Sequence, residues 1–163
     1  MRSTTSLILL FASTFPLLNG TAAQAQVATA NLGVQIIITG GCAVQNVVGV
    51  NFGSVPLLTS NIDTTGSFDV VCTSGIPYSI SLNGGGGGTV NARRMALSST
   101  FIGYQLYSDP ARSQVWGETL NVDRVIGTGS GTAQPQTVYA RVPPQTTPAA
   151  GTYTDTVTIS VNY

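Results

Sequence analysis

The side chains that could do acid–base or nucleophilic chemistry are few in this chain. Its 163 residues include six acidic residues, six arginines and two cysteines, but no histidine and no lysine. Two carboxylate pairs could in principle act as they do in glycosidases: Asp63 with Asp69, and Asp109 with Glu118. Their neighbourhoods resemble loops and exposed strand positions, which favours ordinary surface carboxylates. Because the usual general bases and nucleophile activators are missing, we predict that the protein is not an enzyme.

Metal or cofactor binding has little support in the sequence. Asp109 and Asp123 could give oxygen ligands to calcium, but no ligand run of EF-hand type surrounds them. The glycine run at residues 83–88 lacks the strand-to-helix transition and the lysine of a phosphate-binding loop, so we interpret it as a hairpin loop. We therefore predict no cofactor and no metal.

The first residues have the features of a secretory signal peptide. Arg2 precedes an apolar stretch at residues 7–18, and Ala23-Gln24-Ala25 has the small-x-small form of a cleavage site. We assign residues 1–25 to the signal peptide, which leaves 163 − 25 = 138 residues, enough for one compact domain. The alternative is an uncleaved anchor, although Pro16 and Asn19 interrupt the apolar run. No other segment is expected to enter a membrane.

The two cysteines are expected to form a disulfide. Thiols do not stay free after export, so Cys42 and Cys72 should pair. A metal site built on this pair is the alternative, and it would need further ligands in a chain without histidine. Closing a loop of about 30 residues contributes on the order of 3 to 4 kcal/mol in the loop-entropy model.

The mature chain carries unusually little charge. Its five arginines and six acidic residues give 5 − 6 = −1, and charged residues make up 7% of the whole chain, against roughly a quarter in average proteins. Nucleic acids and acidic membranes need clustered positive charge, so we predict neither as a partner. The one basic pair, Arg93-Arg94, is interpreted as a solvated strand end.

The remaining pattern predicts an all-β domain. Short runs rich in Val, Ile, Thr, Tyr and Phe alternate with turn residues, and no long window keeps a helical spacing of apolar residues. Their number and spacing are typical of a sandwich. Trp116 and the tyrosines could form a sugar-stacking surface, but core or rim positions are favoured. The expected strands lie within residues 43–52, 66–73, 78–82, 95–97, 101–107, 122–126, 137–142 and 153–163.

Two amphipathic strands stand out at the ends of the mature chain. At residues 28–38 every even position is apolar, so one face of this strand is suited to burial. The last strand alternates in the same way, with Asp155 as the only interruption of its apolar face, and no further strand is expected to cover it. The even positions of the first strand are Ala28, Ala30, Leu32, Val34, Ile36 and Ile38.

These landmarks together resemble the spore coat protein U domain family, which includes subunits of archaic (Csu-type) chaperone–usher pili. The order and combination of the matching pieces are specific, and they cover nearly the whole mature chain. The pieces are GCAV (41–44), NFG (51–53), VVCT (70–73), PYSISL (77–82), RM (94–95), YQLYSD (104–109), WG (116–117), VYARVP (138–143) and GTYTDTVTISVNY (151–163).

The resemblance implies an immunoglobulin-like β-sandwich that lacks its final strand. Residues 26–41 would then be a donor strand and linker, and residues 42–163 the pilin domain. A groove in the domain would hold first a strand of a periplasmic chaperone and then the donor strand of the next subunit, delivered by an outer-membrane usher. The groove residues we expect are Phe52, Val157, Ile159 and Val161.

The resulting expectation is a head-to-tail homopolymer, an extracellular fimbria that supports adhesion and biofilm formation. Two alternatives stay open. Gly40-Gly41 could turn the first strand back onto its own domain, giving a self-complemented monomeric binding module. The same module could also serve as a spore or cell-surface coat protein. A pilus-tip adhesin would need a separate receptor domain, for which 138 residues leave no room.

Overall fold

A computed structural model describes residues 25–163 of the chain. Most of the predicted signal peptide therefore lies outside the described residues. The chain divides after Ile36 into an N-terminal unit and a β domain that begins at Ile37. No helix in the described part of the chain is long and apolar enough to cross a bilayer.

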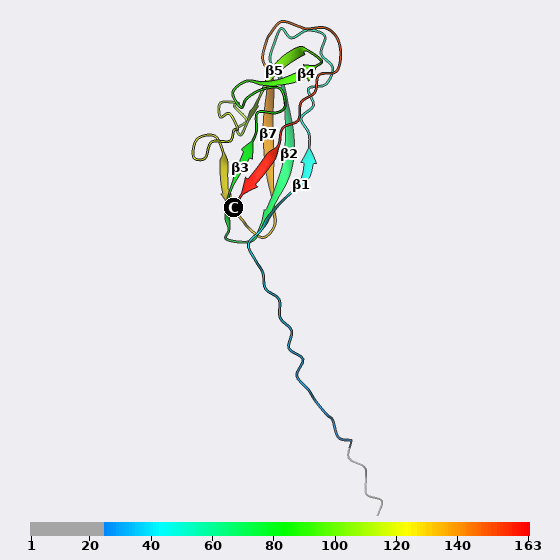
Figure 1. Cartoon of the computed structure of the whole chain (residues 1–163), viewed down its shortest axis with the longest axis vertical. Coiled ribbons are helices and arrows are strands. Elements are labelled where there is room, and N and C mark those ends of the chain that lie inside the picture. Colours follow the sequence, from blue (N-terminus) through cyan, green and yellow to red (C-terminus); the bar gives the residue numbers. More distant parts are fainter. Residues whose placement is uncertain (1–24) are drawn as a thin grey trace, which may run out of the picture. The chain divides into compact units, whose positions relative to one another are not determined.

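The β domain contains eight strands in two sheets, as the alternating sequence pattern predicts (Figure 1). The larger sheet has the order β1-β2-β7-β5-β4 and the smaller one β6-β3-β8, with all neighbours antiparallel. The strands are β1 (Cys42–Val48), β2 (Ile62–Cys72), β3 (Pro77–Leu82), β4 (Arg93–Leu97), β5 (Thr100–Tyr107), β6 (Val125–Thr128), β7 (Ala133–Val142) and β8 (Ile159–Asn162).

The core lies between the two sheets. Phe68 and Val70 of β2 and Ile80 of β3 are almost completely buried, because alternate residues of each strand point to the inner face. Trp116 packs against Phe68 with ring centroids 5.9 Å apart, and its indole N–H donates a 3.0 Å hydrogen bond to the carbonyl of Ile80. The core placement predicted for Trp116 is thus confirmed, and the domain has the immunoglobulin-like sandwich arrangement.

The sandwich is open along one side. β1 pairs only with β2, and β8 pairs only with β3, so each is an edge strand of its sheet. In the described residues no strand follows β8. Figure 1 shows β8, in red, beside β3, the one strand with which it pairs. The predicted sandwich without a final strand is therefore the architecture of this domain.

Two sequence interpretations need correction. Arg93 is not at a solvated strand end: it is 1% exposed, and only Arg94 faces solvent. The glycine run at residues 83–88 is not a hairpin loop either, because β3 and β4, which it joins, lie in different sheets. Both errors come from long-range packing that a local pattern does not encode.

The last strand is also shorter than expected. Residues 153–158 keep the predicted alternation of half-buried and exposed side chains, but only Thr154 makes a bridge, to Ala96 at the edge of the larger sheet. Regular pairing with β3 begins at Ile159. The C-terminal segment thus passes from one sheet to the other, and its first half has few main-chain partners.

Candidate functional site: an apolar groove between two sheet edges

A groove opens into the core between the edge strand β1 and the C-terminal segment. Its volume is about 510 Å³. The groove is open to solvent along its length and is lined mainly by apolar side chains. One wall is formed by residues 47–52 and the other by residues 152–157 and Ile159.

The floor of the groove is the hydrophobic core itself. It consists of Phe68, Leu82, Tyr104, Leu106 and Val138, all buried on the inner faces of their strands. The apolar surface that a covering strand would exclude from water lies mainly on the walls, where Val47 and Val48 are largely exposed, and each Å² covered is worth about 25 cal/mol. The sheet edges on both sides also leave main-chain groups unpaired, which favours addition of a strand.

The groove continues past Phe52 into a second hollow of about 480 Å³. Both hollows share Phe52, Met95 and Tyr153, and the second extends toward Leu58 and Val142. Phe52 lies with its ring edge toward Tyr104, at a centroid separation of 6.4 Å. The two hollows therefore form one extended apolar channel along the open side of the sandwich.

Asp155 is the only charged residue that lines either hollow. Its carboxylate accepts hydrogen bonds from the Tyr104 hydroxyl at 2.7 Å and from the main-chain N–H groups of Gly86 and Thr156 at 2.8 Å. Burial, followed by the hydrogen bond to Asp155, raises the pKa of Tyr104, so its hydroxyl stays protonated and keeps donating. The one charged group of the groove is thus internally satisfied.

Three of the four groove residues expected from the sequence lie on its walls. Phe52, Val157 and Ile159 line the first hollow. Val161 is half-buried against the core but lies beyond the hollow, on the part of β8 that pairs with Ile80. The expectation missed Val48, Val50, Tyr153 and the floor residues. Alternation with Phe52 and Val157 would have found the wall residues.

The N-terminal segment, in contrast to the groove, presents its apolar side chains to solvent. Residues 28–38 form no strand, and Leu32, Val34 and Ile36 are between 82% and 89% exposed. Ile38, which belongs to the β domain, is 71% exposed. Contiguous apolar exposure of this kind is typical of segments that bind another surface.

The disulfide predicted from the two cysteines is present. Cys42 and Cys72 are cross-strand partners on β1 and β2 and are joined by a bond of 2.04 Å. The bond ties the start of β1, the edge strand that leads into one wall of the groove, to the end of its neighbour β2. It therefore supports the site although it lies outside it.

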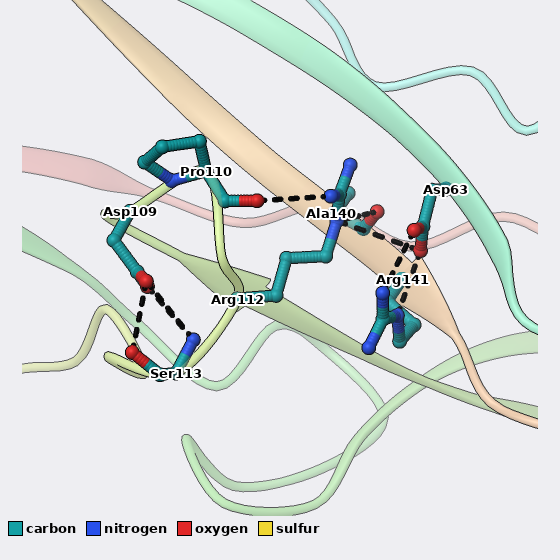
Figure 2. A network of polar contacts seen from close by, with 7 residues as sticks. All are labelled: Asp63, Asp109, Pro110, Arg112, Ser113, Ala140 and Arg141. Carbon is teal, nitrogen blue, oxygen red and sulfur yellow. Dashed lines mark hydrogen bonds and ion pairs between the residues drawn. The ribbon is translucent and has the colours of Figure 1, made fainter.

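The carboxylates considered for catalysis are occupied elsewhere. Asp63 makes a bidentate ion pair with Arg141, at 2.7 and 2.8 Å, and Arg112 approaches it at 3.4 Å (Figure 2). Asp69 accepts a hydrogen bond from the Asn46 side chain at 2.8 Å. The hydrogen bond from Arg141 lowers the pKa of Asp63, which keeps this carboxylate ionised. An ion pair on the sheet surface accounts for Asp63 without a catalytic role.

The remaining acidic candidates hold loops in place. Asp109 accepts hydrogen bonds from the main-chain N–H groups of Ser113 and Gln114, which lower its pKa, as does the Ser113 hydroxyl. Asp123 accepts one from the N–H of Thr119 at 2.6 Å. In the described part of the chain no three potential ligands of His, Cys, Asp or Glu type gather as a metal site would require.

Comparison with known proteins identifies the family. Residues 28–160 match the model of the Spore Coat Protein U domain, and the chain belongs to this family. The chain is 34% identical over 158 residues to Protein U of Myxococcus xanthus, covering 86% of this chain and 88% of that protein.

A solved structure shares the fold. It is the crystal structure of the CsuC–CsuE chaperone–tip adhesion subunit pre-assembly complex from archaic chaperone–usher Csu pili of Acinetobacter baumannii. The matched chain is 28% identical, with a TM-score of 0.55 over 77% of the present chain. The present chain spans only 40% of the solved chain's length.

Proposed function

We propose that the protein is a structural subunit of a fibre assembled by donor-strand exchange through the chaperone–usher pathway. The observation that carries this proposal is the pairing of two incomplete features in one chain. The domain has an open apolar groove between two sheet edges, and the same chain has an exposed segment with apolar residues at every second position. Adding a strand to a sheet edge satisfies main-chain groups and places alternate side chains in pockets, a mode for which pilin complementation is a standard example.

The donor segment is long enough to cover the groove wall. At about 3.3 Å per residue, residues 28–38 extend over roughly 36 Å, and the stretch 152–159 covers roughly 26 Å. Burial of Leu32, Val34, Ile36 and Ile38 would contribute on the order of 6 to 12 kcal/mol before entropy costs. That range is enough for slow dissociation once ladder hydrogen bonds are added.

The occupant we assign to the groove is the donor segment of a second copy. Donor and acceptor are different surfaces of the same molecule, so the contact is head-to-tail and generates an open filament. The exterior, poor in charge and rich in hydroxyl groups, suits a polymer outside the cell. We place the finished fibre on the cell surface after transit through the periplasm, where it supports adhesion and biofilm formation.

Before assembly the groove needs protection from aggregation, because open sheet edges pair with other chains. We assign this role to a strand of a periplasmic chaperone, and delivery of the subunit to an outer-membrane usher. The family and the chaperone–subunit complex among its structural neighbours support this order of events. No catalysis is assigned to any residue.

The experiment is co-expression of the full-length chain with a candidate periplasmic chaperone, followed by purification and a polymerisation assay. We expect a stable one-to-one complex that releases fibres. Ile36→Asp should keep the complex but stop fibre growth, since a charge would have to enter an apolar groove. Gln35→Asp, on the opposite face of the strand, is the matched control and should polymerise. Equal fibre growth of both variants would overturn the proposal.

A second candidate is a coat protein built on the same module, favoured by the 34% identity to Protein U. It would use the same groove and donor segment. The difference is the final location, which immunogold labelling of the producing cells reveals: filaments extending from the surface support the fibre, and a continuous layer supports the coat.

A further inference from the structure

The glycine run at residues 83–88 contacts the wall of the groove. The main-chain N–H of Gly86 donates to the carboxylate of Asp155 at 2.8 Å. Asn83 makes two hydrogen bonds with Thr158: its own N–H donates at 3.2 Å, and its side-chain oxygen accepts at 2.9 Å. The loop therefore holds both ends of the wall segment 155–158.

The same carboxylate also reaches the groove floor. Its second oxygen accepts the hydrogen bond from the Tyr104 hydroxyl, which comes from β5 in the larger sheet. Asp155 thus joins the loop, the wall and the floor at one point. Outside these contacts, the bridge between Thr154 and Ala96 is the only main-chain pairing that the described structure shows for residues 152–157.

The base of the loop is firmly held. Arg93 is buried, and its guanidinium donates to the carbonyls of Asn83 at 2.9 Å, Leu82 at 2.7 Å and Trp116 at 2.8 Å. A further bond of 2.6 Å goes to the side-chain oxygen of Gln105. The loop can therefore act as a fixed support for the wall.

Glycine is required at one position of this loop for two reasons. Gly85 has a φ of 75°, which other residues rarely adopt. A Cβ at Gly85 would overlap the Asp155 carboxylate. At the neighbouring Gly86 a Cβ would lie 3.6 Å from the same carboxylate, an ordinary contact.

We propose that residues 83–88 and Asp155 form a clasp that holds the groove wall at the separation an incoming strand needs. This inference rests on the proposed donor-strand function. Asp155 acts here as a positioning residue. A wall that is held in place before binding loses less conformational entropy when the strand enters, so the clasp raises the affinity of the groove for its donor.

The test uses the chaperone complex of the full mature chain carrying Ile36→Asp, which cannot donate its own strand. A fluorescent peptide of residues 26–40 is the probe, and its uptake and release are followed by anisotropy. Gly85→Ala is expected to lower the affinity for the peptide about tenfold, the size of one or two lost hydrogen bonds. Gly86→Ala, the matched control, should bind like the parent. Equal affinities of the two variants would overturn the clasp.

A double variant separates the clasp from backbone strain. An alanine at position 85 acts on the groove by displacing the Asp155 carboxylate. In an Asp155→Ala background that carboxylate is already gone, so Gly85→Ala should change the peptide affinity little further. Fully additive losses would overturn the role of Asp155. Amide exchange supplies the local measurement: residues 154–158 should exchange faster in Asp155→Ala, whereas β2 and β7 should not change.

The chaperone complex that carries Ile36→Asp but no loop substitution, the parent of these variants, tells the two proposals apart. If its groove takes up the peptide and rejects a peptide carrying Val34→Asp, the donor-strand function stands whatever the loop variants do. If the parent groove takes up neither peptide, the proposed function itself fails. The clasp is overturned alone when the parent binds normally and Gly85→Ala binds equally well.

Discussion

Cys42 and Cys72 are directly opposite each other on β1 and β2, with Cα atoms 4.1 Å apart, and their disulfide is the covalent link between the edge strand β1 and the rest of its sheet. β1 has a neighbour on one side only, and most of its residues are exposed. The bond therefore stabilises an element that packing holds weakly, and that element leads into one wall of the groove.

Removing this disulfide should destabilise the subunit. Cys42→Ala combined with Cys72→Ala is expected to cost about 3 to 4 kcal/mol of unfolding free energy in the loop-entropy model. Periplasmic yield of the chaperone complex should fall, and the melting temperature of the peptide-filled subunit should drop. Unchanged yield and melting temperature would show that β1 does not depend on the bond.

Arg93 should tolerate no substitution, not even by lysine. Its planar guanidinium donates to three main-chain carbonyls and to the Gln105 side chain at once, and a lysine ammonium has too few donors and the wrong geometry to replace it. Arg93→Lys is expected to cost about 2 to 4 kcal/mol, since buried carbonyls lose their partners. The measurement is urea unfolding of the subunit saturated with the peptide of residues 26–40.

The neighbouring arginine provides the control. Arg94 is exposed, and its guanidinium lies 4.4 Å from the ring centroid of Phe101. Arg94→Lys should cost less than about 1 kcal/mol, because a lysine retains the charge above the ring. A similar loss for both variants would contradict the buried role of Arg93.

The ion pair of Asp63 with Arg141 predicts a pH-dependent contribution to stability. The pKa of Asp63 is lowered from 3.8 in the folded protein, chiefly by the hydrogen bond from Arg141. The contribution is therefore complete above about pH 4 and is lost as the pH falls through the lowered pKa. The pair is partly exposed, so we expect no more than about 1 kcal/mol.

Thermal unfolding of the parent and of Asp63→Asn checks this prediction. The difference in melting temperature should be present at neutral pH and shrink in strong acid, and added salt should reduce it. A difference that stays constant from neutral to strongly acidic pH would mean that packing, not charge, accounts for the effect.

Donor and acceptor defects should complement each other. Ile36→Asp removes the donor, and Val157→Asp places a charge in the groove wall, so neither variant should polymerise alone. Their mixture should give one-to-one dimers, since Val157→Asp still donates and Ile36→Asp still accepts. Size-exclusion chromatography with mass detection shows the outcome, and dimers of Ile36→Asp with itself would contradict the assignment.

Most of the strands were predictable because alternation of apolar and polar residues is a local signal, whereas the missing final strand was implied by the family resemblance. Alternation along residues 153–161 correctly indicated which side chains of the C-terminal segment face inward. The disulfide followed from two cysteines in a chain whose first residues have the features of an export signal. The strands depend on the two-residue period of apolar side chains, and the disulfide depends on an export signal. A single sequence contains both.

The clasp and the buried arginine were not predictable from local pattern. Arg93 becomes buried because carbonyls from β3, its following loop and the Trp116 segment converge on it. Asp155 looked like a defect in an apolar face, but its partners Gly86 and Tyr104 lie 69 and 51 residues away in the sequence. Such sites exist only after the two sheets have packed.

The most direct test of the central claim is photo-crosslinking within fibres grown from an equal mixture of ordinary and ¹⁵N-labelled subunits. A photoreactive residue at position 34 should attach to peptides from the groove walls, residues 47–52 or 152–159. We predict that crosslinked pairs of mixed isotope occur as often as pairs of the same isotope. Crosslinks confined to pairs of the same isotope would show that each donor segment fills its own groove, and would contradict donor-strand exchange.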